Sequence, residues 1–315
     1  MLYEKINLWN KDEYDEDRTQ PEMAVFSLKG RKKRPAVVIF PGGGYHHLAP
    51  GEGESVAMQF LANGYQAFIV KYTVMPKNYQ EPLKDATRAM CIIRDNCEKW
   101  RVDPDQIAVI GFSAGGHLAS SLATLYDADF LQNIAGMEKG KNRPNLLISC
   151  YSVLSSQESA IHSGSFENLF GEDKSQYEKL SIEKNVHEDM PPVFIWHTFA
   201  DGGVSVNNSL LFAAALKENP AHLYKSIGID RSPDFEGCFK LKRTQGAAAA
   251  HQEEGFLVFT ANTVKFSDGC FDRPHCEVIW RRTEDDQACT AMLVKNMTTE
   301  EFEETFGGQV EFMYP

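Results

Sequence analysis

The residues IAVIGFSAGGHLA, from Ile107 to Ala119, constrain the fold of this chain more than any other stretch. An apolar run rich in β-branched residues meets Gly111-Phe-Ser113-Ala-Gly115, and small and apolar residues of helical character follow. A serine on a sharp turn between strand and helix needs glycine two positions away on either side, because a larger side chain would collide with it. Gly116 adds a small residue that would let the helix lie close to the sheet. The stretch therefore has the form of a nucleophile elbow with Ser113 at its tip.

Apolar runs of strand character alternate with segments of helical spacing on both sides of this elbow. The sequence also predicts a turn at Val102 to Asp105. Strands are expected at 26–28, 36–40, 65–72, 107–110, 145–151 and 193–197, and helices at 55–63, 85–100 and 209–218. This alternation predicts an α/β fold with a mostly parallel, doubly wound sheet and helices on both faces.

The charge balance narrows the classes of partner. The chain of 315 residues carries 32 basic and 44 acidic residues, a formal net charge of −12. Such a balance disfavours nucleic acid and anionic membrane surfaces, because both are themselves negatively charged. A small molecule that is neutral or weakly polar fits better as a partner. No span of about 18 apolar residues occurs, so we expect no transmembrane helix.

The cysteines and the first residues indicate a reducing compartment. Seven cysteines are an odd number without tight spacing, and residues 1–20 carry charges throughout with no apolar run typical of a signal peptide. We therefore expect free thiols and a cytoplasmic location. Cys270, His275 and Cys276 are the nearest approach to a metal site, but no paired C-x-x-C completes it. We expect neither a metal nor another cofactor.

Two further segments carry candidate site residues. Gly42, Gly43 and Gly44 directly follow the strand at 36–40, and a glycine run there can direct successive N–H groups into one space, as an oxyanion hole requires. The alternative is a flexible loop. Asp201 follows the strand at 193–197, where ligands bind in open α/β sheets, although an aspartate before glycine also suits a simple turn. The polar segment 155–189 lies where insertions commonly cover an active site.

Four blocks carry a resemblance to a known family. They are PGGGY at 41–45, LKDATRAM at 83–90, VDPDQIAVIGFSAGGHLA at 102–119 and PPVFIWHTFADGGVSVNNSLLFAAAL at 191–216. In this order they resemble the α/β-hydrolase family and, within it, the small esterases related to acetylxylan and feruloyl esterases, over roughly residues 24–224.

The resemblance implies a role for each matching position. Ser113 would be the nucleophile, Asp201 the acid that orients a histidine, and the backbone N–H groups of Ala114 and the Gly43 to Gly44 turn the oxyanion hole. It also implies a serine esterase that removes small acyl groups, above all acetyl, from sugars or xylo-oligosaccharides. A second hypothesis is a catalytically impaired hydrolase-fold protein that binds acylated sugars or a partner.

The family histidine is missing from its usual place. It should follow Asp201 by about one helix and one strand, near residues 227–237, and no histidine occurs there. His251 and His275 lie 50 and 74 residues after Asp201. We favour His251, because it needs the smaller insertion. Two alternatives stay open: His275 is the base, or the chain has no histidine in this role.

The other histidines that we weighed fit the role less well. His46 and His47 follow the glycine loop and could touch substrate, whereas His117 lies inside the elbow helix and suits packing. His197 precedes Asp201, and His222 follows it by only 21 residues.

From about Lys225 the likeness to the family ends. We therefore divide the chain into a hydrolase core at 1–225 and a divergent segment at 226–315, with strands expected at 256–260 and 277–280 and a helix at 298–305. Three origins stay open for this segment: a divergent end that still supplies a histidine, an appended segment, or an altered reading frame.

Overall fold

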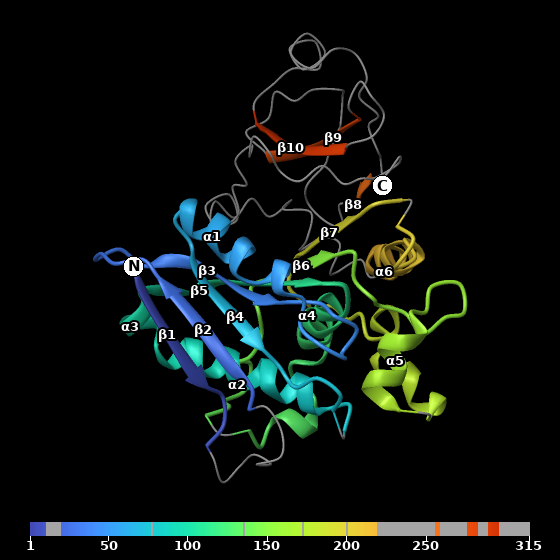
Figure 1. Cartoon of the computed structure of the whole chain (residues 1–315), viewed down its shortest axis with the longest axis horizontal. Helices are drawn as coiled ribbons and strands as arrows, with labels where there is room; N and C mark the ends of the chain where they lie inside the picture. The colour runs from blue at the N-terminus through green and yellow to red at the C-terminus, as the bar shows by residue number, and fades with distance from the viewer. Residues whose placement is uncertain are drawn as a thin grey trace.

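The computed structural model describes residues 1–10, 20–76, 78–134, 136–171, 173–199 and 201–218, and three short strands further along the chain. Its centre is an eight-stranded sheet with the order β1-β2-β4-β3-β5-β6-β7-β8 (Figure 1). The strands are β1 (Leu2–Asn7), β2 (Glu22–Ser27), β3 (Arg34–Phe40), β4 (Gln66–Lys71), β5 (Val102–Phe112), β6 (Leu146–Cys150), β7 (Val193–His197) and β8 (Phe256–Val258). The five strands from β4 to β7 in this order pair in parallel, while β1 and β2 at one edge and β8 at the other pair antiparallel.

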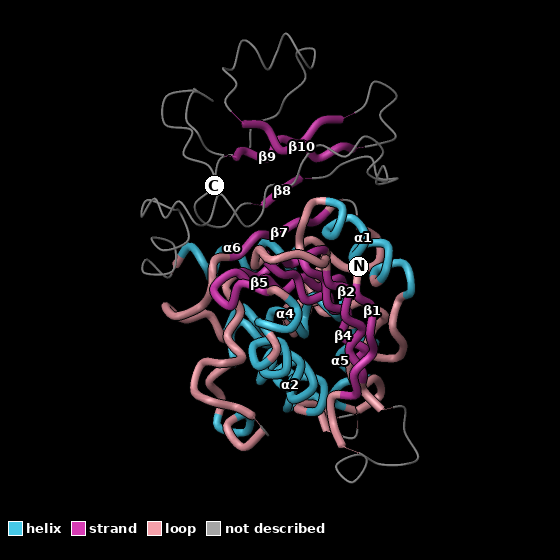
Figure 2. Tube along the Cα trace, turned by 90° about the vertical axis from the view of Figure 1, so that its left-hand side faces the viewer, coloured by secondary structure: helices cyan, strands magenta, loops and turns pink. Residues whose placement is uncertain are grey.

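Helices cover both faces of the sheet (Figures 1 and 2). The α-helices are α1 (Glu54–Ala62), α2 (Glu81–Asp95), α3 (Cys97–Trp100), α4 (Ser113–Leu125), α5 (Ser163–Phe170) and α6 (Asn207–Lys217). Short 3₁₀ turns are η2 (Pro50–Glu52), η3 (Asp129–Leu131), η4 (Lys174–Leu180) and η5 (Ile182–Lys184).

Alternate residues of the buried strands face two separate hydrophobic cores. In β3, Val38 and Phe40 pack in the core formed with α2, α4 and α6, whereas Val37 and Ile39 pack in the core formed with α1. Both sets are fully buried. A continuous apolar run is therefore explained by a strand that is covered on both faces. The predicted mostly parallel sheet with helices on both faces is confirmed.

Three local predictions need correction. The predicted helix over 85–100 is two helices, because α2 ends at Asp95 and α3 begins at Cys97. The predicted turn at 102–105 is wrong, since β5 already begins at Val102, with a shift in its pairing register to β3 before Ile107. Strand β1 was not expected, because its residues alternate between partly exposed and exposed and carry no apolar run.

Beyond residue 218 the structure describes β8, β9 (Cys276–Arg282) and β10 (Cys289–Lys295), of which β9 and β10 pair antiparallel as a separate two-stranded sheet. Strands were predicted near β8 and β9, whereas β10 was not. The predicted helix at 298–305 lies outside the described residues, and the boundary at residue 225 stays a prediction.

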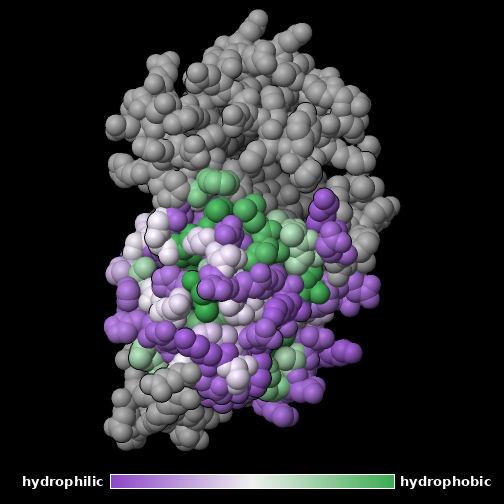
Figure 3. All heavy atoms as spheres, turned by 90° about the vertical axis from the view of Figure 1, so that its right-hand side faces the viewer, coloured by the Kyte–Doolittle hydropathy of each residue, from purple (hydrophilic) through white to green (hydrophobic). Residues whose placement is uncertain are grey.

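The surface of the described part is mainly polar on the side that carries α5 and α6, with hydrophobic side chains gathered at one edge (Figure 3). Among the described residues, none of the helices is both long and apolar enough to cross a bilayer. Three cysteines of this part, Cys91, Cys97 and Cys150, are buried free thiols.

Candidate active site

Ser113 lies at the turn between β5 and α4, where it is the first residue of the helix. Its φ angle is +51°, in the left-handed region that residues other than glycine seldom adopt. The side chain is half-buried, and within the described part of the chain its Oγ has no hydrogen-bond partner. A strained serine with an uncommitted hydroxyl at the carboxyl end of a central strand is the arrangement that a nucleophile elbow predicts.

The glycines around Ser113 allow several pieces of the chain to approach closely. A Cβ on Gly111 would lie 2.2 Å from the carbonyl oxygen of Gly115, and a Cβ on Gly115 would lie 2.1 Å from that of Phe40. A Cβ on Gly116 would lie 1.8 Å from a serine hydroxyl in the loop after β6. The predicted requirement for small residues at positions 111, 115 and 116 is confirmed. The nearest contacts of a Cβ at Gly111 are with the backbone of Gly115 and Gly116, and those of a Cβ at Gly115 are with the backbone of Phe40 and Pro41.

The glycine loop, residues 41–45, passes directly against the elbow. A Cβ on Gly42 would lie 3.0 Å from the Ser113 Cβ, and Gly43 and Gly44 have φ angles of +120° and +64° that favour glycine. Side chains from four separate segments hold this loop. They are Tyr72, which donates to Pro41 O (2.7 Å), Glu52, which accepts from Gly42 N (2.6 Å), Asn168, which donates to Gly44 O (2.8 Å), and His117, which bonds the Tyr45 hydroxyl (2.8 Å). The loop is therefore held in place, and the alternative of a flexible glycine run is not supported.

Three backbone N–H groups next to Ser113 make no hydrogen bond within the described part of the chain. Within the described part of the chain, the N–H groups of Gly43, Gly44 and Ala114 have no hydrogen-bond acceptor, although the carbonyl of Gly43 accepts from His46 and His47. Free N–H groups at a helix N-terminus and an adjacent glycine turn suit a developing oxyanion. These are the three residues that the resemblance to the family implies for the oxyanion hole.

His117 is a structural residue, as its position inside α4 predicts. It is fully buried, and its Nε2 bonds Leu180 O at 2.7 Å. Since a carbonyl can only accept, Nε2 carries the proton and Nδ1 accepts from the Tyr45 hydroxyl. Burial lowers the pKa of His117 to about 4. The neutral ring therefore connects the glycine loop to η4.

We expect the stability contributed by His117 to depend on pH. With a folded pKa of about 4 against 6.5 unfolded, its contribution is complete above pH 6.5 and is lost as the pH falls toward 4. The destabilisation caused by His117→Gln should therefore shrink by about 2 kcal/mol between pH 7 and pH 5. Urea unfolding of both proteins at the two pH values measures this. The exposed His46 gives a control, His46→Gln, and equal destabilisation by His117→Gln at both pH values would contradict the expectation.

Asp201 lies beyond the carboxyl end of β7, two strands from the end of β5. Its Oδ1 accepts from the N–H groups of Gly203 (2.8 Å) and Val204 (2.9 Å), and its Oδ2 lies 3.6 Å from His197 Nε2. Burial by itself raises the pKa of Asp201, but these contacts together lower it below its ordinary value. Adjacent strands lie about 4.8 Å apart, so about 10 Å separates β5 from β7 and leaves room for a third group between Ser113 and Asp201.

His197 is occupied in holding the loop that carries Asp201. The ring is fully buried, its Nε2 bonds Val204 O at 2.9 Å, and its Nδ1 bonds Ser209 Oγ at 2.8 Å. Both nitrogens are therefore engaged within the fold, which agrees with the expectation that His197 is not the base.

The segment after β6 covers the glycine loop. Asn168 of α5 bonds Gly44, and Ser165 Oγ would lie 3.7 Å from a Cβ on Gly44. The ring of His162 caps α5, with its Nδ1 2.9 Å from Ser165 Oγ. His162 was not among the predicted site residues, and Ser165 alone connects it to the glycine loop.

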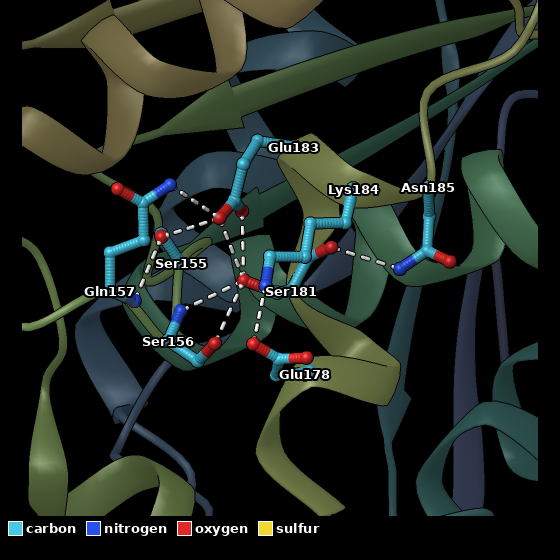
Figure 4. A network of polar contacts seen from close by, with 8 residues as sticks. All are labelled: Ser155, Ser156, Gln157, Glu178, Ser181, Glu183, Lys184 and Asn185. Carbon is cyan, nitrogen blue, oxygen red and sulfur yellow. Dashed lines mark hydrogen bonds and ion pairs between the residues drawn. The ribbon is translucent and has the colours of Figure 1, made fainter.

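A carboxylate-centred network fixes this covering segment (Figure 4). Glu183 accepts hydrogen bonds from Ser155 Oγ (2.7 Å), Gln157 Nε2 (3.2 Å) and Ser181 Oγ (2.8 Å), and so joins the two ends of the segment. Asn208 of α6, which is fully buried, accepts from the N–H groups of residues 154 and 155. The expectation that the polar insertion reaches the site is thus supported by contacts.

The structure brings Ser113, Ala114, Gly43 and Gly44 together, with Asp201 two strands away. His251 and His275 lie outside the described residues, so the identity of the base stays a prediction. Among the described residues, no cluster of three or more His, Cys, Asp or Glu side chains is suited to hold a metal ion.

The family model BD-FAE matches residues 24–216. Endo-1,4-beta-xylanase B of Butyrivibrio fibrisolvens is 34% identical over 221 residues, which are 67% of this chain and 34% of that protein. Acetylxylan esterase of Xylanibacter ruminicola is 32% identical over 165 residues, which are 52% of this chain and 32% of that protein. The match thus spans about a third of the length of each of these relatives.

Among solved structures, an acetyl ester-xyloside bifunctional hydrolase from Caldicellulosiruptor lactoaceticus is similar to this chain with a TM-score of 0.62 and 37% identity. The match covers 69% of this chain and 82% of that one.

Proposed function

The chain belongs to the BD-FAE family and has the α/β-hydrolase fold, and from this premise we propose that it is a serine carboxylic ester hydrolase. The observation that supports this most directly is the strained Ser113, with an uncommitted hydroxyl, beside the uncommitted N–H groups of Ala114, Gly43 and Gly44. A nucleophile next to oxyanion donors is what acyl transfer requires.

The proposed reaction has two steps. A histidine, His251 or His275, takes the proton of Ser113 Oγ, and the oxygen attacks the ester carbonyl while the N–H groups stabilise the negative charge that forms on the carbonyl oxygen. Collapse of this intermediate expels the alcohol, which receives the proton, and leaves an acyl-serine that water hydrolyses. Each oxyanion donor is worth about 2.7 to 4 kcal/mol of transition-state stabilisation. Asp201, ionised by its lowered pKa, would orient the histidine.

The substrate class that we propose is acetylated sugars or xylo-oligosaccharides. It is supported by the printed names of the relatives, an acetylxylan esterase and an acetyl ester-xyloside hydrolase. The net charge of −12 agrees with a neutral substrate in place of a polyanion.

We expect p-nitrophenyl acetate to give a burst of one p-nitrophenol per protein molecule, since an acyl-enzyme forms before it is hydrolysed. Ester hydrolysis by His251→Ala beside His275→Ala then identifies the base, because only the variant that lacks it loses turnover. Loss in neither variant would exclude both histidines as the base.

The second candidate is a hydrolase-fold protein without turnover that binds acylated sugars or a partner. It is favoured by the missing histidine at residues 227–237. In that case wild type shows no burst and no labelling by a fluorophosphonate, while an acetylated xylo-oligosaccharide still raises the melting temperature.

A further inference from the structure

A carboxylate that the proposed reaction does not use lies beside the nucleophile. Glu52, at the end of η2, accepts the Gly42 N–H on Oε2 at 2.6 Å and the Tyr151 hydroxyl on Oε1 at 2.8 Å. A Cβ on Gly42 would lie 2.8 Å from Glu52 Oε2 and 3.0 Å from the Ser113 Cβ. The carboxylate therefore touches the loop at the point where the loop meets the nucleophile.

The contact with Gly42 differs from the other contacts that hold the glycine loop. Tyr72 and Asn168 donate to carbonyls of Pro41 and Gly44, whereas Glu52 accepts an N–H. The Gly42 carbonyl in turn accepts from Ala49 N at 2.9 Å, within the turn that leads to Glu52. Both polar groups of the Gly42 backbone are thus bound by residues 49–52, which fixes the peptide immediately before Gly43.

Tyr151 connects the same carboxylate to the next strand. It follows β6 with a φ angle of +37°, and its N–H donates to Trp196 O of β7 at 2.7 Å. Burial raises the pKa of Tyr151, with further contributions from Glu52 and Asp201. The tyrosine therefore stays a neutral donor. Through Glu52 it links β6 and β7 to the glycine loop.

We propose that Glu52 is a positioning residue that accepts the Gly42 N–H and the Tyr151 hydroxyl, and thereby sets the N–H groups of Gly43 and Gly44 against Ser113. This inference rests on the proposed function, because it concerns the same site. Glu52 does not touch the reacting atoms. Its effect is on the geometry of the oxyanion donors, where small displacements lower the rate of reaction.

The first test measures the loop itself in the full chain. Hydrogen exchange of the peptide that contains residues 40–48 should become at least about tenfold faster at Gly42 in Glu52→Ala, because the N–H loses its acceptor. Glu52→Gln keeps an oxygen for this N–H and an amide group for Tyr151, and should exchange within about twofold of wild type. Glu54, which is exposed and next to Gly53, gives the matched control Glu54→Ala.

The second test measures ester hydrolysis by the same variants. Glu52→Ala should lower kcat at least about tenfold while KM stays within about twofold, Glu52→Gln should restore most of kcat, and Tyr151→Phe should fall between them. Thermal unfolding of each variant shows whether it is folded. Unchanged exchange in Glu52→Ala, or equal damage from Glu52→Gln and Glu52→Ala, overturns the proposal. A wild type without turnover and without fluorophosphonate labelling would refute the esterase and not the positioning, because the exchange experiment needs no turnover.

Discussion

Ser113→Ala is expected to remove the p-nitrophenol burst and to lower kcat/KM for p-nitrophenyl acetate by about 10⁴-fold or more. In the proposed reaction this hydroxyl forms the acyl-enzyme, so the variant would keep only the rate enhancement from the proposed oxyanion donors and from binding. The backbone should tolerate the change, because alanine meets the same cost as serine at a φ angle of +51°. Steady-state and stopped-flow hydrolysis measure both effects.

The matched control for this prediction is Ser175→Ala. Ser175 is exposed, and its hydroxyl bonds Asp173 in the turn before η4. Its removal should leave the burst within about twofold of wild type. Unchanged turnover in Ser113→Ala would contradict the proposal that this serine is the nucleophile, whatever the histidine variants show.

The central strands could be predicted from the sequence because they are buried on both faces. Residues 36–40 and 107–110 are apolar without interruption, and in β3 and β5 they face the two cores alternately. Strand β1 could not be predicted in this way, since it is an edge strand with one exposed face. Pro104 and Asp105 suggest a turn, yet Val102 still pairs with β3 because the change of register accommodates the residues between them.

The backbone elements of the site could also be predicted, because strain and close approach restrict the residue types. Ser113 has a positive φ angle, and Gly115 lies against Phe40 where a Cβ would not fit. The contacts of Glu52 and Asn168 with the glycine loop were not predicted from the sequence. Each contacts the backbone of the glycine loop through a single side-chain bond, and no periodicity or spacing marks such a bond. Asp201 was marked by its place after the strand at 193–197, and its role as the acid was implied by the likeness to the family.

Gly115→Ala is expected to lower the free energy of unfolding by more than about 3 kcal/mol. The new Cβ would lie 2.1 Å from Phe40 O and 2.4 Å from Pro41 O, and both are backbone atoms that no side-chain rotation can remove. Relief requires that the start of α4 move away from the end of β3. This movement would also displace Ser113 from the glycine loop, so the activity of the folded fraction should fall as well.

Gly51→Ala separates this steric effect from the general effect of replacing glycine. A Cβ on Gly51 would meet no atom within 4 Å, and its φ angle is not in the left-handed region. Its free energy of unfolding should therefore stay within about 0.5 kcal/mol of wild type in urea denaturation. If both variants lost the same stability, close approach at the elbow would not be the reason for Gly115. If only Gly115→Ala loses stability, the contact between β3 and α4 that holds the glycine loop beside Ser113 also stabilises the fold.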